Sequence, residues 1–188
     1  MLKKSVLLLA VAGVSLSALA AELRVMTHSS FSLPKERIAE FEKQNGVKLS
    51  IIKGGDAGEM LNKLILTRAN PVADVVYGID NTLIAKATAA GILAPTSSKV
   101  GRTEKDAQLP GAVAVDYGYV TLNYDKAWFA KAKLPLPATL DDLAKPAYKD
   151  LLVVENPATS STGLAFLLAT IADRGEDGAF KWWEKVRD

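Results

Sequence analysis

VKLSIIKGGDAGEMLNKLILTRANPVADVVYG, residues 47–78, is the stretch that decides the fold class. Its first six residues predict a strand, and GGDAG at 54–58 predicts a glycine-rich turn. A helix is predicted next, because apolar residues recur at helical spacing from Met60 to Ile65. A short apolar run at 73–78 then predicts a second strand. This order of strand, helix and strand is typical of a parallel sheet that is covered by helices.

The flanking segments extend the same alternation. ELRVM at 22–26 predicts a strand, and PKERIAEFEKQNG at 34–46 predicts a helix that ends at its glycine. NTLIAKATAAG at 81–91 predicts a further helix, and the residues after it are rich in turn formers and mixed charges. We therefore predict a first α/β lobe over residues 21–112.

A second unit follows. VAVDYGYVTLNYDKAWF, which begins at Val113, predicts a long extended segment before a short helix, and DLLVVENP at 150–157 predicts another strand. An apolar stripe from Leu164 to Ile171 predicts a buried helix face. We predict a hinge or crossover segment at 113–124 and a second α/β lobe at 125–188.

The first twenty residues, MLKKSVLLLAVAGVSLSALA, predict a cleavable signal peptide, with two lysines, an apolar core and a small-x-small end. The protein is therefore expected in the periplasm. Removing this segment changes 23 basic and 21 acidic residues to 21 of each, so the charge argument for a nucleic-acid partner is lost. The absence of cysteine and the single histidine, His28, exclude thiol chemistry and a His-rich zinc site.

Four turns follow predicted strands: 27–31, 54–58, 78–81 and 155–163. Ligands of open α/β sheets bind at the carboxyl ends of strands. Three of these turns belong to the first unit and one to the second. A ligand held between the two units would contact all four.

ENPATSSTG, residues 155–163, places four hydroxyl side chains before a predicted helix. One hydroxyl is enough to cap a helix, and the others could hold a ligand anion at the helix N-terminus. Both interpretations stay open from the residues alone. Asp56 likewise fits either a turn-forming role or a ligand contact, and Asp80 either caps the next helix or faces a cationic ring.

The chain resembles the periplasmic thiamine-binding proteins of ABC importers, within the type II periplasmic solute-binding proteins. The resemblance is carried by ADVVYGIDNTLIAKA (73–87), VAVDYGYVTLNYDK (113–126) and ENPATSSTGLAFLL (155–168), with weaker support from VMTHSSF (25–31) and GDAGEMLNKL (55–64). It implies a type II α/β fold with two lobes around a hinge. It also implies a monomeric binder that captures thiamine or its phosphates and delivers it to a membrane permease.

The same resemblance suggests site residues. Asp56 and Ala57 fall on the turn whose acid and backbone N–H line the phosphate end of the family's site, and Ser160 and Ser161 fall on its hydroxyl pair, beside Thr159. His28 occupies a position where the family often has a ligand-facing tyrosine.

Tyr117 is the remaining candidate of this set. It and Tyr119 would face the same side of a strand, where they could form either a stacking surface or hinge packing.

Two departures from the family pattern matter. The loop after Phe31 lacks a tryptophan that some members have, and members are usually much longer than this chain. We expect the second lobe to be truncated at Asp188 and the first lobe to lack its returning C-terminal elements. Further aromatic ligand contacts are then expected beyond Asp188.

Two other functions compete with thiamine binding. A ferric-iron or polyamine binder of the same fold remains open. A secreted hydrolase of phosphate esters, with Ser160 or Ser161 as nucleophile, is disfavoured because His28 is the only histidine and lies in the other lobe. We therefore predict a binding protein with no catalytic residue, no metal and no cofactor.

Overall fold

The computed structural model describes residues 21–95, 109 and 111–187. Its sheet has three parallel strands, β1 (Ala21–Thr27), β2 (Val47–Lys53) and β3 (Val75–Tyr77). Their order is β2-β1-β3, so β1 is central. β1 pairs with β2 along its whole length and with β3 over its last three residues. The predicted parallel arrangement is confirmed.

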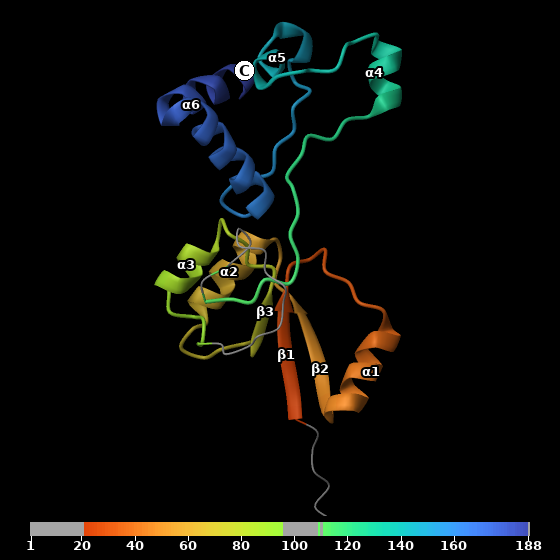
Figure 1. The fold of residues 1–188 in the computed structure, drawn as a ribbon, viewed down its shortest axis with the longest axis vertical. Coiled ribbons are helices and arrows are strands. Elements are labelled where there is room, and N and C mark those ends of the chain that lie inside the picture. Colours follow the sequence, from red (N-terminus) through yellow and green to blue (C-terminus); the bar gives the residue numbers. More distant parts are fainter. Residues whose placement is uncertain (1–20, 96–108, 110, 188) are drawn as a thin grey trace, which may run out of the picture.

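Three helices flank this sheet. α1 (Lys35–Asn45) lies on one side, and α2 (Ala57–Leu66) and α3 (Ile84–Ala89) lie on the other (Figure 1). α1 ends at Gly46, whose φ of 64° is the left-handed conformation that glycine adopts at helix ends. The buried core of this region joins α2 to α3 and consists of Ala57, Leu61, Leu83 and Ala87.

A charged pair fastens the start of β3 to β1. The Arg24 guanidinium donates to both carboxylate oxygens of Asp74, with Nε–Oδ2 and Nη2–Oδ1 distances of 3.1 and 2.8 Å. The backbone N–H of Arg24 donates to the same carboxylate at 2.9 Å. These hydrogen bonds lower the pKa of Asp74 to about 2.

The chain then runs to a second region through an extended stretch. Residues 113–124 carry no helix or strand, and from Val115 onward all of them are exposed. Figure 1 shows this stretch as the green connection between a lower and an upper body. We name residues 21–95 the sheet part, 113–124 the crossover segment and 125–187 the helical part.

The helical part contains α4 (Lys126–Ala132), α5 (Leu140–Leu143), a 3₁₀ helix η2 (Pro146–Tyr148) and α6 (Ser161–Arg187). Gly175 interrupts α6 with a φ of 68° and a ψ of 167°, so the helix is kinked there. Trp182 is buried and donates from Nε1 to the carbonyl oxygen of Leu140 at 2.9 Å. This contact packs the end of α6 against α5.

Two of the predicted strands have different outcomes. The strand predicted at 150–157 is wrong, because this stretch has no neighbouring strand to pair with and Val153 is 90% exposed. The described residues of the helical part therefore contain no sheet. The stretch at 73–78 does form a strand, but it is short and its Val75 is 47% exposed, because β3 lies at the edge of the sheet.

The predicted signal peptide, residues 1–20, lies outside the described residues. Within the part of the chain that the structure describes, no helix combines the length and apolar character needed to cross a membrane.

Candidate functional site

The glycine-rich turn after β2 is fixed to the end of β1. Gly54 donates its N–H to the carbonyl oxygen of Thr27, and Ser29 donates to that of Gly55, both at 2.8 Å. These bonds hold the loops that follow β1 and β2 side by side. The start of α2 is thereby positioned at the carboxyl end of the sheet, where ligands of α/β folds bind.

Asp56 is the N-cap of α2. Its carboxylate accepts from the N–H of Ala57 at 2.7 Å, and its own N–H donates to Glu59 Oε2 at 3.2 Å, which completes a capping box. The Asp56 side chain is exposed, whereas Ala57 is buried. The turn-forming interpretation of Asp56 is thus seen directly, and its exposed carboxylate remains accessible to a ligand.

A second capped helix end is built by residues 155–163. The carbonyl oxygen of Asn156 accepts from the N–H groups of Thr159 and Ser160, at 3.1 and 2.8 Å. The buried Ser160 hydroxyl donates to Glu155 Oε2 at 2.5 Å and accepts from the N–H of Gly163 at 3.3 Å. Ser160 therefore acts as the N-cap of α6.

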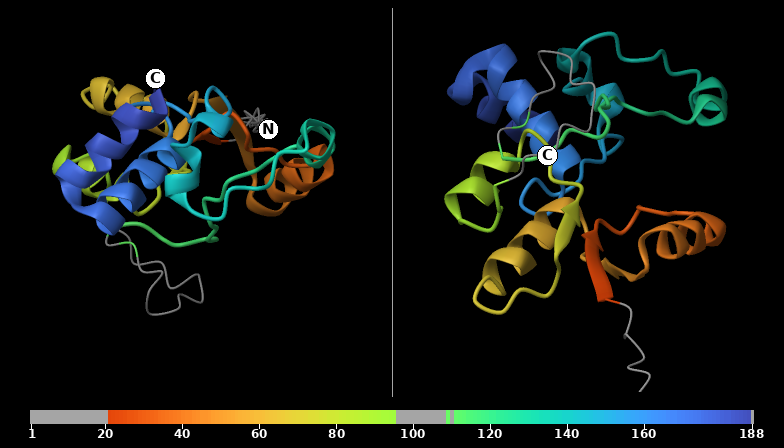
Figure 2. Two further views of the ribbon diagram at one scale, coloured as in Figure 1. Left: turned by 90° about the horizontal axis from the view of Figure 1, so that it is seen from above. Right: turned by 60° about the horizontal axis from the view of Figure 1, so that its bottom comes forward.

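The two helix N-termini meet. The N–H of Gly58 in α2 donates to the carbonyl oxygen of Thr159 at 2.8 Å, so the sheet part and the helical part are in direct backbone contact. Leu164, one turn into α6, packs against the core formed by α2 and α3. Figure 2 shows the start of α6 beside α2 from further directions. We name residues 56–58 and 159–164 the junction.

The junction leaves two backbone donors free. Among the described residues, the N–H groups of Ser161 and Thr162 have no protein acceptor. Both lie in the first turn of α6, where the helix dipole adds partial positive charge. Ser161 is half-buried and Thr162 is exposed. This end of α6 is suited to accept an anion.

Three rings gather near the junction, at the ends of β1 and β3. His28 stacks on Tyr77 with ring centres 6.0 Å apart and planes 29° apart, and Phe31 packs against Tyr77 at 5.0 Å. Lys53, the last residue of β2, donates to the carbonyl oxygen of Phe31 and lies over its ring. We name His28, Phe31 and Tyr77 the aromatic cluster.

The aromatic cluster is also bonded to the crossover segment. The Tyr77 hydroxyl donates to Asp116 Oδ2 at 2.5 Å. The hydrogen bond to this carboxylate raises the pKa of Tyr77, and partial burial acts in the same direction.

The structure brings most of the predicted site residues together. Asp56 and Ala57 directly precede Gly58, whose N–H donates to the carbonyl oxygen of Thr159, and Ser160 and Ser161 directly follow Thr159. His28 belongs to the aromatic cluster, beside the loop that Ser29 ties to Gly55. These residues come from three of the four turns that follow predicted strands.

Tyr117 is not part of this group. It is 74% exposed, and its ring contact is with Tyr119 at 6.2 Å, edge to face. Phe31, Tyr77 and Asp116 were not predicted as site residues. The strand-end rule could have indicated Phe31 and Tyr77, because both follow or end a strand.

Ser160 and His28 each have other partners. Ser160 contacts the carboxylate of Glu155 and is buried, while the ring contacts of His28 are with Phe31 and Tyr77. No group of three His, Cys, Asp or Glu side chains in the described residues could hold a metal ion.

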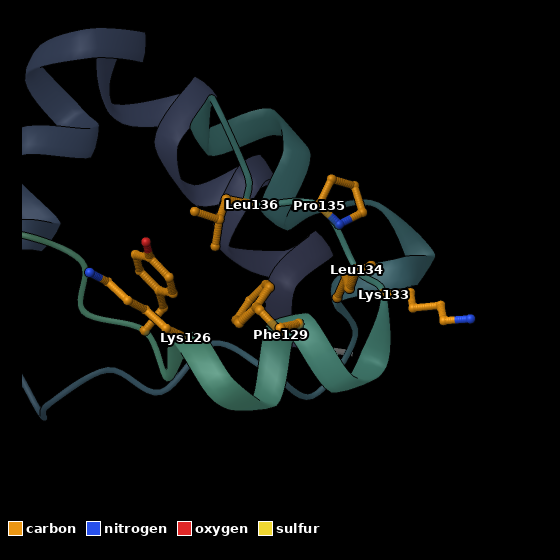
Figure 3. Close-up of a pocket in the computed structure, with 8 residues that line it drawn as sticks. Lys126, Phe129, Lys133, Leu134, Pro135 and Leu136 are labelled. Carbon is orange, nitrogen blue, oxygen red and sulfur yellow. The ribbon is translucent and has the colours of Figure 1, made fainter.

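A cavity of about 500 Å³ lies elsewhere, on α4. Tyr124 and Phe129 form part of its wall, with Lys126 and Lys133 at its edge (Figure 3). It is an open hollow made by one helix and the loops beside it, and none of the predicted site residues lines it. The junction is therefore the candidate site.

Comparison with known proteins agrees with this description. The family model for bacterial extracellular solute-binding proteins matches residues 70–188. The chain is 30% identical over 187 residues to the thiamine-binding periplasmic protein of Brucella abortus, covering 93% of this chain and 53% of that protein. It is 32% identical over 174 residues to the Salmonella typhimurium protein of that name, covering 87% and 50%. It is 24% identical over 165 residues to iron uptake protein A1 of Synechocystis, covering 86% and 44%.

Solved structures give the same picture. A periplasmic thiamin binding protein superposes with a TM-score of 0.66 at 27% identity, over 90% of this chain and 54% of that one. The periplasmic binding protein AfuA from Actinobacillus pleuropneumoniae superposes with a TM-score of 0.69 at 22% identity, over 88% and 54%. The chain spans about half the length of the relatives it matches.

Proposed function

This chain belongs to the bacterial extracellular solute-binding proteins, and on that premise we propose that it is the periplasmic substrate-binding component of an ABC importer for thiamine and its phosphates. Its fold is the α/β fold of type II periplasmic binding proteins. Proteins of this fold that carry thiamine binding in their names support the choice of ligand.

The observation that carries the proposal is the meeting of α2 and α6 at the junction. The Gly58–Thr159 hydrogen bond joins the sheet part to the helical part, although the two residues are 101 positions apart in the sequence. The free N–H groups of Ser161 and Thr162 lie next to this contact. A small ligand bound there would touch both parts at once. Such a ligand stabilises the closed arrangement by its differential affinity for closed and open forms, so no catalytic group is needed.

The proposed ligand orientation follows from charge. We place the phosphate or hydroxyl end of the ligand at the start of α6, where Ser161 and Thr162 supply N–H donors and hydroxyls. We place the ring end toward the aromatic cluster, because thiamine is a cationic heteroaromatic compound. Ser160 positions this site by capping α6.

Delivery to a permease completes the proposal. The predicted signal peptide and the periplasmic relatives support export of the protein, and the family of extracellular binders supports a membrane permease as its partner. We propose a monomer with no enzymatic activity and no cofactor.

Isothermal titration of the chain with thiamine, its monophosphate and its diphosphate tests the ligand. Ferric citrate and spermidine serve as the competing arms, because an iron-uptake protein is among the relatives. Heat with thiamine compounds and none with the others is expected. Tight binding of iron or spermidine without thiamine binding would refute the proposal.

Ser161→Ala tests the orientation of the ligand. We expect weaker binding of the two phosphates by about tenfold, because a hydrogen bond to a charged group contributes roughly 1.5–3 kcal/mol. Free thiamine should lose less. Thr88→Ala, which removes an exposed hydroxyl from α3, is the matched control. An equal loss for all three ligands would place the phosphate elsewhere.

A further inference from the structure

The aromatic cluster sits where three strand ends converge. Gly78 follows β3 with a φ of 113°, and a Cβ atom there would lie 2.7 Å from Cδ2 of His28. The backbone thus approaches the His28 ring closely on one side, while Tyr77 stacks on the ring. Tyr77 contacts both other rings of the cluster, and His28 and Phe31 also meet edge to face at 6.5 Å.

Tyr77 has a second, independent contact. Its hydroxyl donates to Asp116, which is an exposed residue of the crossover segment. Among the described residues, this is the one side-chain hydrogen bond between the crossover segment and the sheet part. The other contacts shown for the segment lie within it or lead to α4, as with Tyr124 and Phe129.

We propose that Tyr77 is a positioning residue that couples the ligand site to the hinge: its ring orders the aromatic cluster, while its hydroxyl holds the crossover segment through Asp116. The ligand role of the cluster rests on the proposed function. The coupling itself rests on the two contacts of one side chain.

The physical argument is one of linkage. The Tyr77–Asp116 bond forms only when the crossover segment lies against the end of β3, so it stabilises that arrangement over any in which the two parts have rotated apart. A ligand that packs on the cluster restricts the Tyr77 ring and thereby favours the same bond. By reciprocity, loss of the bond must weaken the binding of any ligand that contacts the cluster.

A distance measurement without ligand tests the coupling directly. The chain has no cysteine, so cysteines placed at the exposed Lys43 in α1 and Lys131 in α4 take a dye pair uniquely. In the parent we expect one narrow distribution of energy-transfer efficiency. Tyr77→Phe keeps the ring but removes the hydrogen bond, and it should broaden the distribution toward longer distances.

Two further variants make the result specific. Asp116→Ala should reproduce the effect of Tyr77→Phe, and the double variant should add nothing to either single change, because all three remove the same bond. Tyr117→Phe is the matched control, since it deletes a hydroxyl from a 74% exposed tyrosine one position after Asp116. It should leave the distribution unchanged.

Thiamine titration of the same variants measures the linkage. Tyr77→Phe and Asp116→Ala should each raise Kd by about three- to tenfold, with no further increase in the double variant. Circular dichroism checks that each variant is folded. Asp116→Asn retains an acceptor oxygen, so it should keep most of the thiamine affinity that Asp116→Ala loses.

The outcomes separate this inference from the proposed function. If the parent binds no thiamine, the proposed function fails, and the ligand-free distances still decide the coupling. Equal distributions for Tyr77→Phe and Tyr117→Phe would overturn the coupling. The coupling would also be overturned if the increases in Kd from Tyr77→Phe and Asp116→Ala multiplied in the double variant.

Discussion

Gly58 shows how a single residue lets two helix ends touch. A Cβ atom at this position would lie 2.7 Å from the carbonyl oxygen of Thr159 and 2.8 Å from its carbonyl carbon. Both are backbone atoms, which cannot turn aside as a flexible side chain can. The absence of a side chain is therefore what permits the Gly58–Thr159 hydrogen bond.

We predict that Gly58→Ala opens the junction. Overpacking against backbone should reduce the free energy of unfolding by about 1–3 kcal/mol and weaken ligand binding at the same time. Chemical denaturation and calorimetric titration measure the two effects. Gly118→Ala is the control, because a Cβ atom at Gly118 meets nothing within 4 Å. Unchanged stability in Gly58→Ala would contradict the observed contact.

Asp56 combines a cap with an exposed charge, and two substitutions separate these roles. Asp56→Ala removes the capping oxygen and should cost about 1 kcal/mol of stability. Asp56→Asn keeps a good capping residue, so its stability should stay close to that of the parent. If the carboxylate accepts a hydrogen bond from the hydroxyl end of the ligand, Asp56→Asn should nevertheless weaken thiamine binding by about tenfold. Identical binding by the parent and Asp56→Asn would leave Asp56 with the capping role alone.

At the scale of elements, the sequence predicted those strands that find a partner. The apolar runs at 22–26 and 47–52 pair along β1 and β2 for their full length. The run at 150–157 also contains consecutive apolar residues but forms no strand, and residues 150, 151 and 157 lie in turns. A strand depends on hydrogen bonds to a neighbour, and the residues of the stretch itself carry no information about whether one is present.

The Arg24–Asp74 pair, which we call the clamp between β1 and β3, makes the stability of the fold depend on pH. The pKa of Asp74 is about 2 in the folded chain, below its ordinary value of 3.8, because Arg24 donates to the carboxylate. The stabilisation is therefore complete above pH 3.8 and is lost as the pH falls through about 2.

We predict that Asp74→Asn lowers the thermal unfolding temperature at neutral pH and that its difference from the parent narrows as the pH falls from about 4 to about 2. Thermal melts between pH 7 and pH 2 measure this. Asp177→Asn, a change at an exposed acid of α6, serves as the control. A difference that stays constant over this range would show that the clamp does not titrate as described.

At the scale of the whole molecule, Leu164 is the apolar link between the two parts. It belongs to α6 but packs against the core of α2 and α3. We predict that Leu164→Ala costs about 1–2 kcal/mol, less than for a fully buried leucine because Leu164 is half-buried. It should also separate the unfolding of the sheet part from that of the helical part. Calorimetric unfolding tests both effects.

Leu168→Ala removes a 44% exposed leucine from the same helix and is the control for helix propensity and size. Equal effects of Leu164→Ala and Leu168→Ala would mean that the contact across the junction contributes nothing to stability.

The candidate site could be predicted only in part, because some of its residues follow a local sequence pattern and others meet only in the folded chain. The rule that ligands bind at strand ends indicated the turns of Asp56 and His28, which depend on local pattern. The hydroxyl-rich turn before α6 was found by its composition, although no strand precedes it. The Tyr77–Asp116 hydrogen bond joins residues 39 positions apart, and no local sequence pattern predicts such a pair.

The kink at Gly175 has a mechanical consequence. Across it, Trp183 donates from Nε1 to the hydroxyl of Thr170 at 2.9 Å, and the Phe166 ring meets that of Trp183 at 5.5 Å. These two contacts join the residues before the kink to those after it, and we expect them to fix the angle between the two arms of α6. One arm begins at Ser161 and Thr162, whose N–H groups are the proposed anion donors, and the other packs against α5 through the Trp182–Leu140 hydrogen bond. We therefore expect both arms of α6 to move as one body when the helical part rotates. A ligand bound to the N–H donors at the start of α6 would then displace the whole helix and α5 with it.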